Sequence, residues 1–114
     1  MTTQKTILCV EDEDDLRGDI AEELETADYR VLQAANGSEA LALLEKHHPD
    51  LVLCDITMPG LGGYDVLKAS REQGGMEDVP FIFLTALATA FFAVCEAQQY
   101  PVFSQYYFNE LVDN

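Results

Sequence analysis

Short apolar runs of strand type alternate with helix-type segments between residues 6 and 84, and this alternation limits the possible folds more than any other feature. The strand-type runs are residues 6–10, 29–34, 51–54 and 79–84. The helix-type segments between them are residues 14–26, 36–47 and 63–73. Two of the runs, 6–10 and 51–54, are continuously apolar, which is typical of strands buried on both faces. Strands that alternate with helices favour an α/β fold, in which helices cover both faces of a parallel sheet.

Local signals mark where the expected helices begin and end. Leu16, Ile20 and Leu24 recur four residues apart, so they share one face of the first helix. Asn36 is followed three residues later by Glu39, which is the form of a capped helix start. Pro49 disfavours continuation of this second helix beyond about residue 47.

The last quarter of the chain has a different composition. All six Lys and Arg residues precede residue 72, whereas seven of the eleven aromatic residues follow residue 90. A helix is expected at residues 86–97, a fifth strand at 101–103 and a short last helix at 106–112. With 114 residues and no visible linker, the chain is expected to form one domain over residues 1–114.

The composition also excludes several classes of protein. A net charge of −15 argues against direct binding of nucleic acid, because a polyanion would be repelled. No apolar run approaches the length of a membrane span, and the first residues lack the pattern of a secretory signal. The three cysteines form no C-x-x-C pair, so neither a disulfide framework nor a zinc site is indicated. The expected compartment is the cytoplasm, with no membrane association.

Polar residues follow three of the apolar runs, at the point where each expected strand ends. Glu11 and Asp12 come after the first run, Asp55 after the third and Thr85 after the fourth. Since the carboxyl ends of parallel strands meet at one edge of a sheet, these residues are expected to converge. Clustered carboxylates repel one another unless they bind a cation, and all-oxygen ligands suit Mg²⁺. The sequence therefore predicts a magnesium site that includes Asp55.

Each of these residues also has an ordinary structural explanation. The alternative explanations are loop acids for Glu11 and Asp12, a helix cap for Asp55, and an ordinary strand-end threonine for Thr85. A loop rather than a helix is expected after Asp55, and the two acids follow a buried strand, so the metal site is favoured. Thr85 alone would support no functional interpretation.

Three segments resemble one protein family. ILCVEDE at residues 7–13 is similar to the first strand and acidic pair of response regulator receiver domains. LVLCDITMPGLGGYDVL at residues 51–67 resembles their phosphorylation segment, with Pro59 four residues and Gly63 eight residues after Asp55. FLTA at residues 83–86 resembles the strand that ends in the switch Thr or Ser. The resemblance covers residues 5–86, whereas residues 87–114 diverge.

The resemblance implies a fold, a function and a role for each matched residue. The fold is a doubly wound, flavodoxin-like (CheY-like) sheet of five parallel strands, here with a short or irregular last helix. Asp55 would accept a phosphoryl group from a histidine kinase or phosphotransfer protein. Asp12 would bind Mg²⁺ directly and Glu11 through water, with Asp55 and the backbone carbonyl of Thr57 as further ligands. Thr85 would supply the switch hydroxyl. Such a domain is a signalling module rather than an ordinary enzyme, and a downstream protein would respond to it.

The chain departs from the family pattern in one important respect. Receiver domains carry a Lys-Pro pair after the fifth strand, but this chain has no Lys after Lys68. Two alignments place either Ser104 or Tyr107 at the Lys position, and neither residue is a cation. A natural divergent receiver, a non-native ending after about residue 86, and a degenerate receiver that binds partners without phosphate all remain open. In the last case, the aromatic residues at 100–108 would favour a homodimer.

Overall fold

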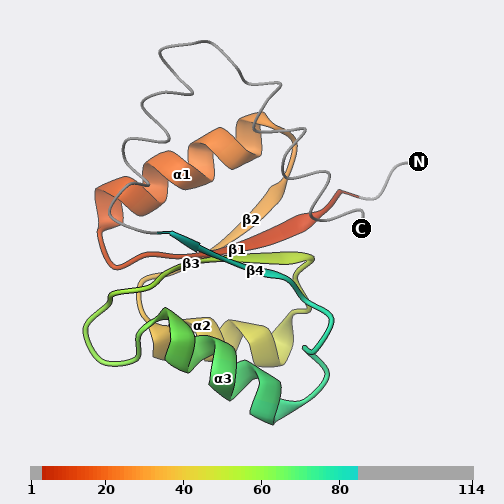
Figure 1. Cartoon of the computed structure of the whole chain (residues 1–114). Coiled ribbons are helices and arrows are strands. Elements are labelled where there is room, and N and C mark those ends of the chain that lie inside the picture. The colour runs from red at the N-terminus through yellow and green to blue at the C-terminus, as the bar shows by residue number, and fades with distance from the viewer. Residues whose placement is uncertain (1–3, 85–114) are drawn as a thin grey trace.

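The computed structural model describes residues 4–84 of the chain. Four strands alternate with three helices (Figure 1). The strands are β1 (Thr6–Val10), β2 (Arg30–Ala34), β3 (Leu51–Asp55) and β4 (Phe81–Leu84). The helices are α1 (Asp14–Thr26), α2 (Gly37–Lys46) and α3 (Gly63–Gln73). Within residues 4–84, no helix has both the length and the apolar character needed to cross a membrane.

The four strands form one parallel sheet in the order β2-β1-β3-β4. The strand β1 therefore lies inside the sheet, and the chain winds outward from it in both directions. The register pairs Val10 of β1 with Cys54 of β3, and it pairs Asp55 of β3 with Leu84 of β4. The doubly wound parallel arrangement expected from the sequence is confirmed, while the predicted fifth strand lies outside the described residues.

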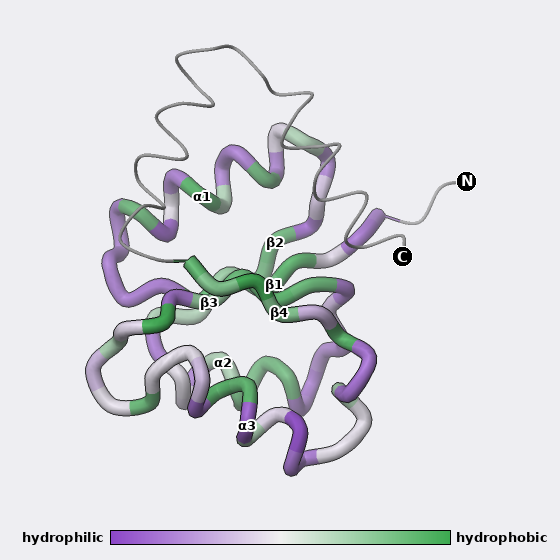
Figure 2. Tube along the Cα trace, viewed as in Figure 1, coloured by the Kyte–Doolittle hydropathy of each residue, from purple (hydrophilic) through white to green (hydrophobic). Residues whose placement is uncertain are grey.

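Helices cover both faces of the sheet: α1 lies on one side, and α2 and α3 lie on the other (Figure 1). Successive residues of β1 point to opposite faces, as the pleat of a strand requires. Ile7 and Cys9 pack with the α1 residues Ile20 and Leu24. The other face of the sheet packs with α2 and α3 through a second apolar cluster, which includes Leu8, Val10, Leu44, Val52 and Val66. Apolar residues concentrate along the central strands between these layers (Figure 2).

The observed ends of the elements follow from local hydrogen bonds. The helices at 14–26 and 63–73 begin and end as predicted. The α2 helix starts at the predicted cap, because the Asn36 side chain accepts a hydrogen bond from the Glu39 N–H at 2.9 Å. The strand β2 starts one residue later than expected, since the Tyr29 N–H donates to the carbonyl of Leu24 at the end of α1.

The third and fourth strands also differ slightly from the sequence prediction. The strand β3 extends by one residue to include Asp55, which pairs in register with Leu84. The strand β4 begins at Phe81 rather than at residue 79, because the Val79 N–H closes a turn onto the Met76 carbonyl. The elements predicted at residues 86–97, 101–103 and 106–112 lie outside the described part of the chain.

Candidate metal centre

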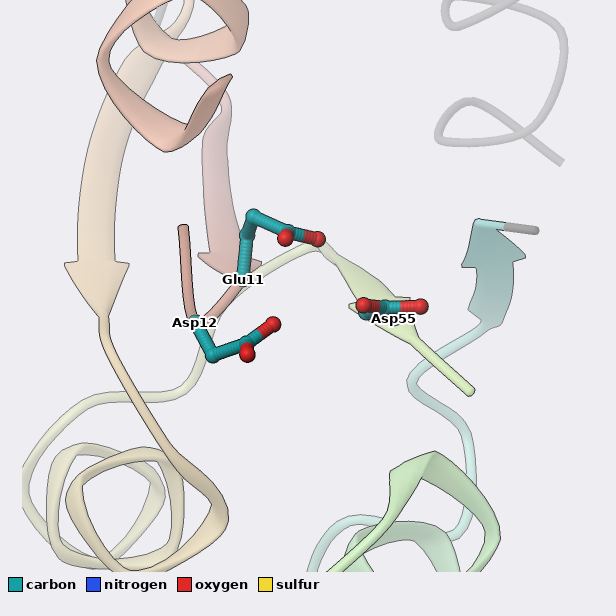
Figure 3. Close-up of side chains that lie close together, drawn as sticks. All are labelled: Glu11, Asp12 and Asp55. Atoms are coloured by element: carbon teal, nitrogen blue, oxygen red, sulfur yellow. The ribbon is translucent and has the colours of Figure 1, made fainter. Parts of the chain in front are cut away.

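Three carboxylates meet at the carboxyl edge of the sheet, where β1 and β3 end side by side. Glu11 and Asp12 directly follow β1, and Asp55 is the last residue of β3. One oxygen atom from each carboxylate lies within 4.8 Å of the others, and the three side chains converge on one region (Figure 3). The convergence expected for these acids is therefore observed.

The three acids differ in their exposure to solvent. The Glu11 side chain is buried, with 3% of the residue exposed, whereas Asp12 is exposed and Asp55 is half-buried. One end of the cluster therefore faces the protein interior and the other faces water. Such a site can hold a cation by protein oxygens on one side and leave positions for water or a ligand on the other.

Backbone hydrogen bonds hold Glu11 in place. Its N–H donates to the carbonyl of Ala34 in β2 at 3.1 Å, which continues the pairing of β1 and β2 by one residue. Its carboxylate oxygen Oε1 accepts a hydrogen bond from the N–H of Glu13 at 3.2 Å. Its carbonyl oxygen accepts a hydrogen bond from Nη1 of Arg17, in the first turns of α1, at 2.8 Å. The orientation of Glu11 is thus fixed at both its main chain and its side chain.

Repulsion among the three carboxylates and the burial of Glu11 govern the electrostatics of the cluster. The pKa of Glu11 is raised from 4.5 to about 7, chiefly by burial and in smaller part by the charge of Asp55, a hydrogen bond with its carboxyl group and the charge of Asp12. The hydrogen bond from the Glu13 N–H opposes this shift. A cation at this position would reverse the effect, because it favours the ionised form of every carboxylate around it.

The donor set fits Mg²⁺. Oxygen ligands about 2.0 to 2.1 Å from one octahedral Mg²⁺ ion lie roughly 2.9 to 4.2 Å from one another. The oxygen atoms of the three acids lie within 4.8 Å of one another, so a small contraction would bring those of Asp12 and Asp55 into this range, and Glu11 is near enough to act through a water molecule. The nearby thiols do not compete as ligands, because burial raises the pKa values of Cys9 and Cys54 to about 12. The site therefore offers hard oxygen ligands, as Mg²⁺ requires.

The loop after Asp55 returns closely to the end of β3. The Thr57 N–H donates to Oδ1 of Asp55 at 3.3 Å, and the Gly63 N–H donates to the Ile56 carbonyl at 2.9 Å. A Cβ atom at Gly63 would lie 2.5 Å from the carbonyl oxygen of Asp55, so a side chain there would collide with the backbone. The absence of a side chain at Gly63 therefore allows the start of α3 to lie close to the backbone of Asp55.

The remaining site predictions have different outcomes. Thr57 lies beside Asp55, as expected, and the role of its carbonyl stays a prediction. Thr85 lies outside the described residues. Sequence reasoning missed the contact between Arg17 and Glu11. One signal was available, because Arg17 is the only cation in the stretch from Glu11 to Asp28, which contains ten acids.

Comparisons with known proteins agree with this geometry. The sequence model of the response regulator receiver domain family matches residues 7–100 of the chain. The chain belongs to the response regulator receiver domain family. This receiver domain is 43% identical over 88 residues to the probable transcriptional regulator ycf27 of Porphyra purpurea, a match that covers 76% of the chain and 35% of the relative. It is 40% identical over 82 residues to the phosphate regulon transcriptional regulatory protein PhoB of Pseudomonas aeruginosa, covering 72% of the chain and 36% of PhoB.

Solved structures confirm the CheY-like, doubly wound fold of the receiver domain. The chemotaxis protein CheY4 of Vibrio cholerae is 32% identical, with a TM-score of 0.69 over 71% of this chain and 68% of CheY4. The response regulator TrrA of Thermotoga maritima, solved in complex with Mg²⁺-BeF, is 38% identical, with a TM-score of 0.66 over 73% of this chain and 70% of TrrA. The receiver domain spans about a third of the length of the curated relatives that it matches.

Proposed function

We propose that the domain binds Mg²⁺ through Glu11, Asp12 and Asp55 and accepts a phosphoryl group on Asp55. The observation that carries this proposal is the convergence of the three carboxylates within 4.8 Å, at the ends of two adjacent strands, in a member of the receiver family. The solved structure of TrrA in complex with Mg²⁺-BeF supports the choice of cation, since that protein has the same fold.

The chain's own residues would divide the work of phosphoryl transfer. Asp12 and Asp55 would bind the cation directly, Glu11 through a water molecule, and the Thr57 carbonyl as a further ligand. When bound, Mg²⁺ would neutralise the charge that develops on the phosphoryl oxygens. The Thr57 N–H holds Oδ1 of Asp55 and so limits rotation of its carboxylate. A carboxylate oxygen of Asp55 would attack the phosphorus of a phosphohistidine whose other ring nitrogen is protonated. The bond from phosphorus to the donor nitrogen would break, so that an acyl phosphate forms and neutral histidine is released.

Thr85 is the proposed switch residue, on the basis of its position in the sequence. It directly follows Leu84, and Leu84 is paired in register with Asp55 across β3 and β4. A hydroxyl group there would donate a hydrogen bond to a phosphoryl oxygen on Asp55. Phosphorylation adds roughly −1.5 to −2 charges, so such a contact would make the end of β4 sensitive to the state of Asp55.

The proposed partners follow from this chemistry and from the relatives. A histidine kinase or phosphotransfer protein would supply the phosphoryl group in the cytoplasm, and the domain would assist its own phosphorylation and dephosphorylation. Because PhoB is a transcriptional regulatory protein and ycf27 a probable transcriptional regulator, we propose that this single domain, residues 1–114, controls a downstream protein of that type. The chain's charge of −15 argues that contact with DNA would be made by that downstream protein and not by this domain.

A direct test is to incubate the protein with Mg²⁺ and acetyl phosphate and to measure its intact mass. The expected result is the added mass of one phosphoryl group, which depends on Mg²⁺ and is lost in Asp55→Asn. An equal gain in Asp55→Asn would show that another residue is modified. The absence of Lys after Lys68 favours a second function, a degenerate receiver that binds partners without phosphate. An unmodified wild-type protein would favour that second function.

A further inference from the structure

Arg17 joins the first turns of α1 to the acidic cluster. Its guanidinium spans two acceptors: Nη1 donates to the carbonyl oxygen of Glu11 at 2.8 Å, and Nη2 donates to Oδ1 of Asp14 at 2.7 Å. The two acceptors are not equivalent, because the Asp14 side chain is 82% exposed whereas Glu11 is buried, with 3% of the residue exposed. Exposed ion pairs contribute little, so the bond to the Glu11 carbonyl is the more important contact.

The oxygen that Arg17 holds belongs to the peptide unit between two proposed ligands. This peptide unit is planar, so the Glu11 carbonyl, the Asp12 nitrogen and the Asp12 Cα move together. The N–H of Glu11 is already fixed by Ala34, on the other side of the Glu11 Cα. The hydrogen bond from Arg17 fixes the second peptide unit and therefore the direction in which Asp12 leaves the end of β1.

We infer that Arg17 is a positioning residue for the metal site. By fixing the peptide unit between Glu11 and Asp12, it holds these two residues in the orientation that binds Mg²⁺. This inference rests on the proposed function, since it takes Glu11 and Asp12 as ligands of Mg²⁺. Arg17 would touch neither the cation nor the phosphoryl group. Its contribution would resemble that of other residues that orient metal ligands, whose loss typically weakens metal binding about 10- to 100-fold.

Charge and positioning predict opposite effects of removing Arg17. A cation near the site repels Mg²⁺, so its removal would tighten Mg²⁺ binding if charge alone mattered. If Arg17 positions Asp12, its removal would weaken Mg²⁺ binding despite the more favourable charge. A purely structural role would lower the midpoint of thermal unfolding but leave the affinity of the folded protein unchanged. The sign of the change in Kd therefore separates the three explanations.

The experiment measures the Kd for Mg²⁺ by calorimetric titration well below the unfolding temperature, at one pH above the pKa of Glu11. The variants are Arg17→Gln, which removes the charge, and Arg17→Lys, which keeps the charge but loses the planar two-pronged geometry. Arg30→Gln is the matched control, because Arg30 is exposed and begins β2, a strand length away from the acidic cluster. The expected result is a Kd about tenfold higher in Arg17→Gln, a smaller increase in Arg17→Lys and no increase in Arg30→Gln.

Two results would overturn the inference. One is a Kd in both Arg17 variants that equals or falls below that of the wild type. The other is an equal increase in Arg30→Gln, which would point to the overall charge of the chain. If Arg17→Gln fails to fold, Arg17→Lys decides by the same criterion. Failure of the proposed function has a different signature, since the wild-type protein itself would then bind no Mg²⁺.

Discussion

Replacing Asp55 by Asn should stabilise the Mg²⁺-free protein and abolish its stabilisation by Mg²⁺. The substitution keeps the size of the side chain and keeps an acceptor for the Thr57 N–H, but it removes one of three clustered charges. The fold holds these carboxylates together, whereas in the unfolded chain they separate into water. Their mutual repulsion therefore lowers the free energy of unfolding, and removing one charge should raise it.

The distances set the size of this effect. Two unit charges 4.8 Å apart repel by about 1 kcal/mol at the dielectric constant of water, and by about 3 to 4 kcal/mol at an effective dielectric near 20. Asp12 is exposed, which places its pair with Asp55 near the lower limit. Glu11 is buried, but its pKa of about 7 means that it is partly protonated near neutral pH. We therefore expect a gain of about 1 to 3 kcal/mol, or roughly 4 to 12 °C in the unfolding midpoint.

Urea unfolding followed by circular dichroism, with either EDTA or Mg²⁺ present, measures both effects. The wild-type protein should gain about 2.7 kcal/mol when Mg²⁺ is a hundred times its Kd, and Asp55→Asn should gain almost nothing. Asp19→Asn is the matched control, since it removes one exposed acid of α1 and corrects for the net charge of −15. The reasoning fails if, in EDTA, Asp55→Asn is no more stable than Asp19→Asn.

Two further predictions concern Glu11 and Gly63. The folded protein keeps a proton on Glu11 up to about pH 7, whereas the unfolded chain releases it near the ordinary pKa of 4.5. The free energy of unfolding, measured in EDTA, should therefore fall as the pH rises from about 4.5 to about 7. Glu11→Gln should flatten this slope in urea titrations at about pH 5 and about pH 8, and an unchanged slope would contradict the assignment. Gly63→Ala should destabilise the fold by about 1 to 3 kcal/mol, because its Cβ would lie 2.5 Å from the Asp55 carbonyl oxygen. Gly18→Ala is its control in thermal unfolding, because a Cβ at Gly18 would meet no atom within 4 Å beyond its chain neighbours and the backbone of its own helix. A gain of up to about 1 kcal/mol is expected there, and equal losses in both variants would refute the collision.

Much of the fold could be predicted because local signals agreed with one another. The apolar residues of β1 and β3 marked buried strands, and the spacing of Leu16, Ile20 and Leu24 marked the buried face of α1. The ends of β2 and β4 were less predictable, because hydrogen bonds from Tyr29 and Val79 to earlier turns decide them. Such bonds depend on how the chain reverses direction, which hydrophobic periodicity does not encode.

The candidate site could be predicted in part for a similar reason. Glu11, Asp12 and Asp55 were identifiable because each follows an apolar strand, and parallel strands bring their carboxyl ends to one edge. The burial of Glu11 beside an exposed Asp12 was not identifiable, since the turn into α1 decides which side chain faces inward. The same turn brings Arg17 to the Glu11 carbonyl.

By itself, the sequence determined the alternation of strands and helices, the family, and which acids stand at the strand ends. Those properties are local, since they follow from side-chain hydrophobicity and from residue spacing along the chain. Only the tertiary structure decided that β1 and β3 are neighbours, that their terminal carboxylates lie within 4.8 Å, and that Arg17 holds the peptide unit between two of them. These properties depend on contacts between segments far apart in the sequence, or on the turn that follows β1. The packing of the helices against both faces of the sheet fixes these contacts.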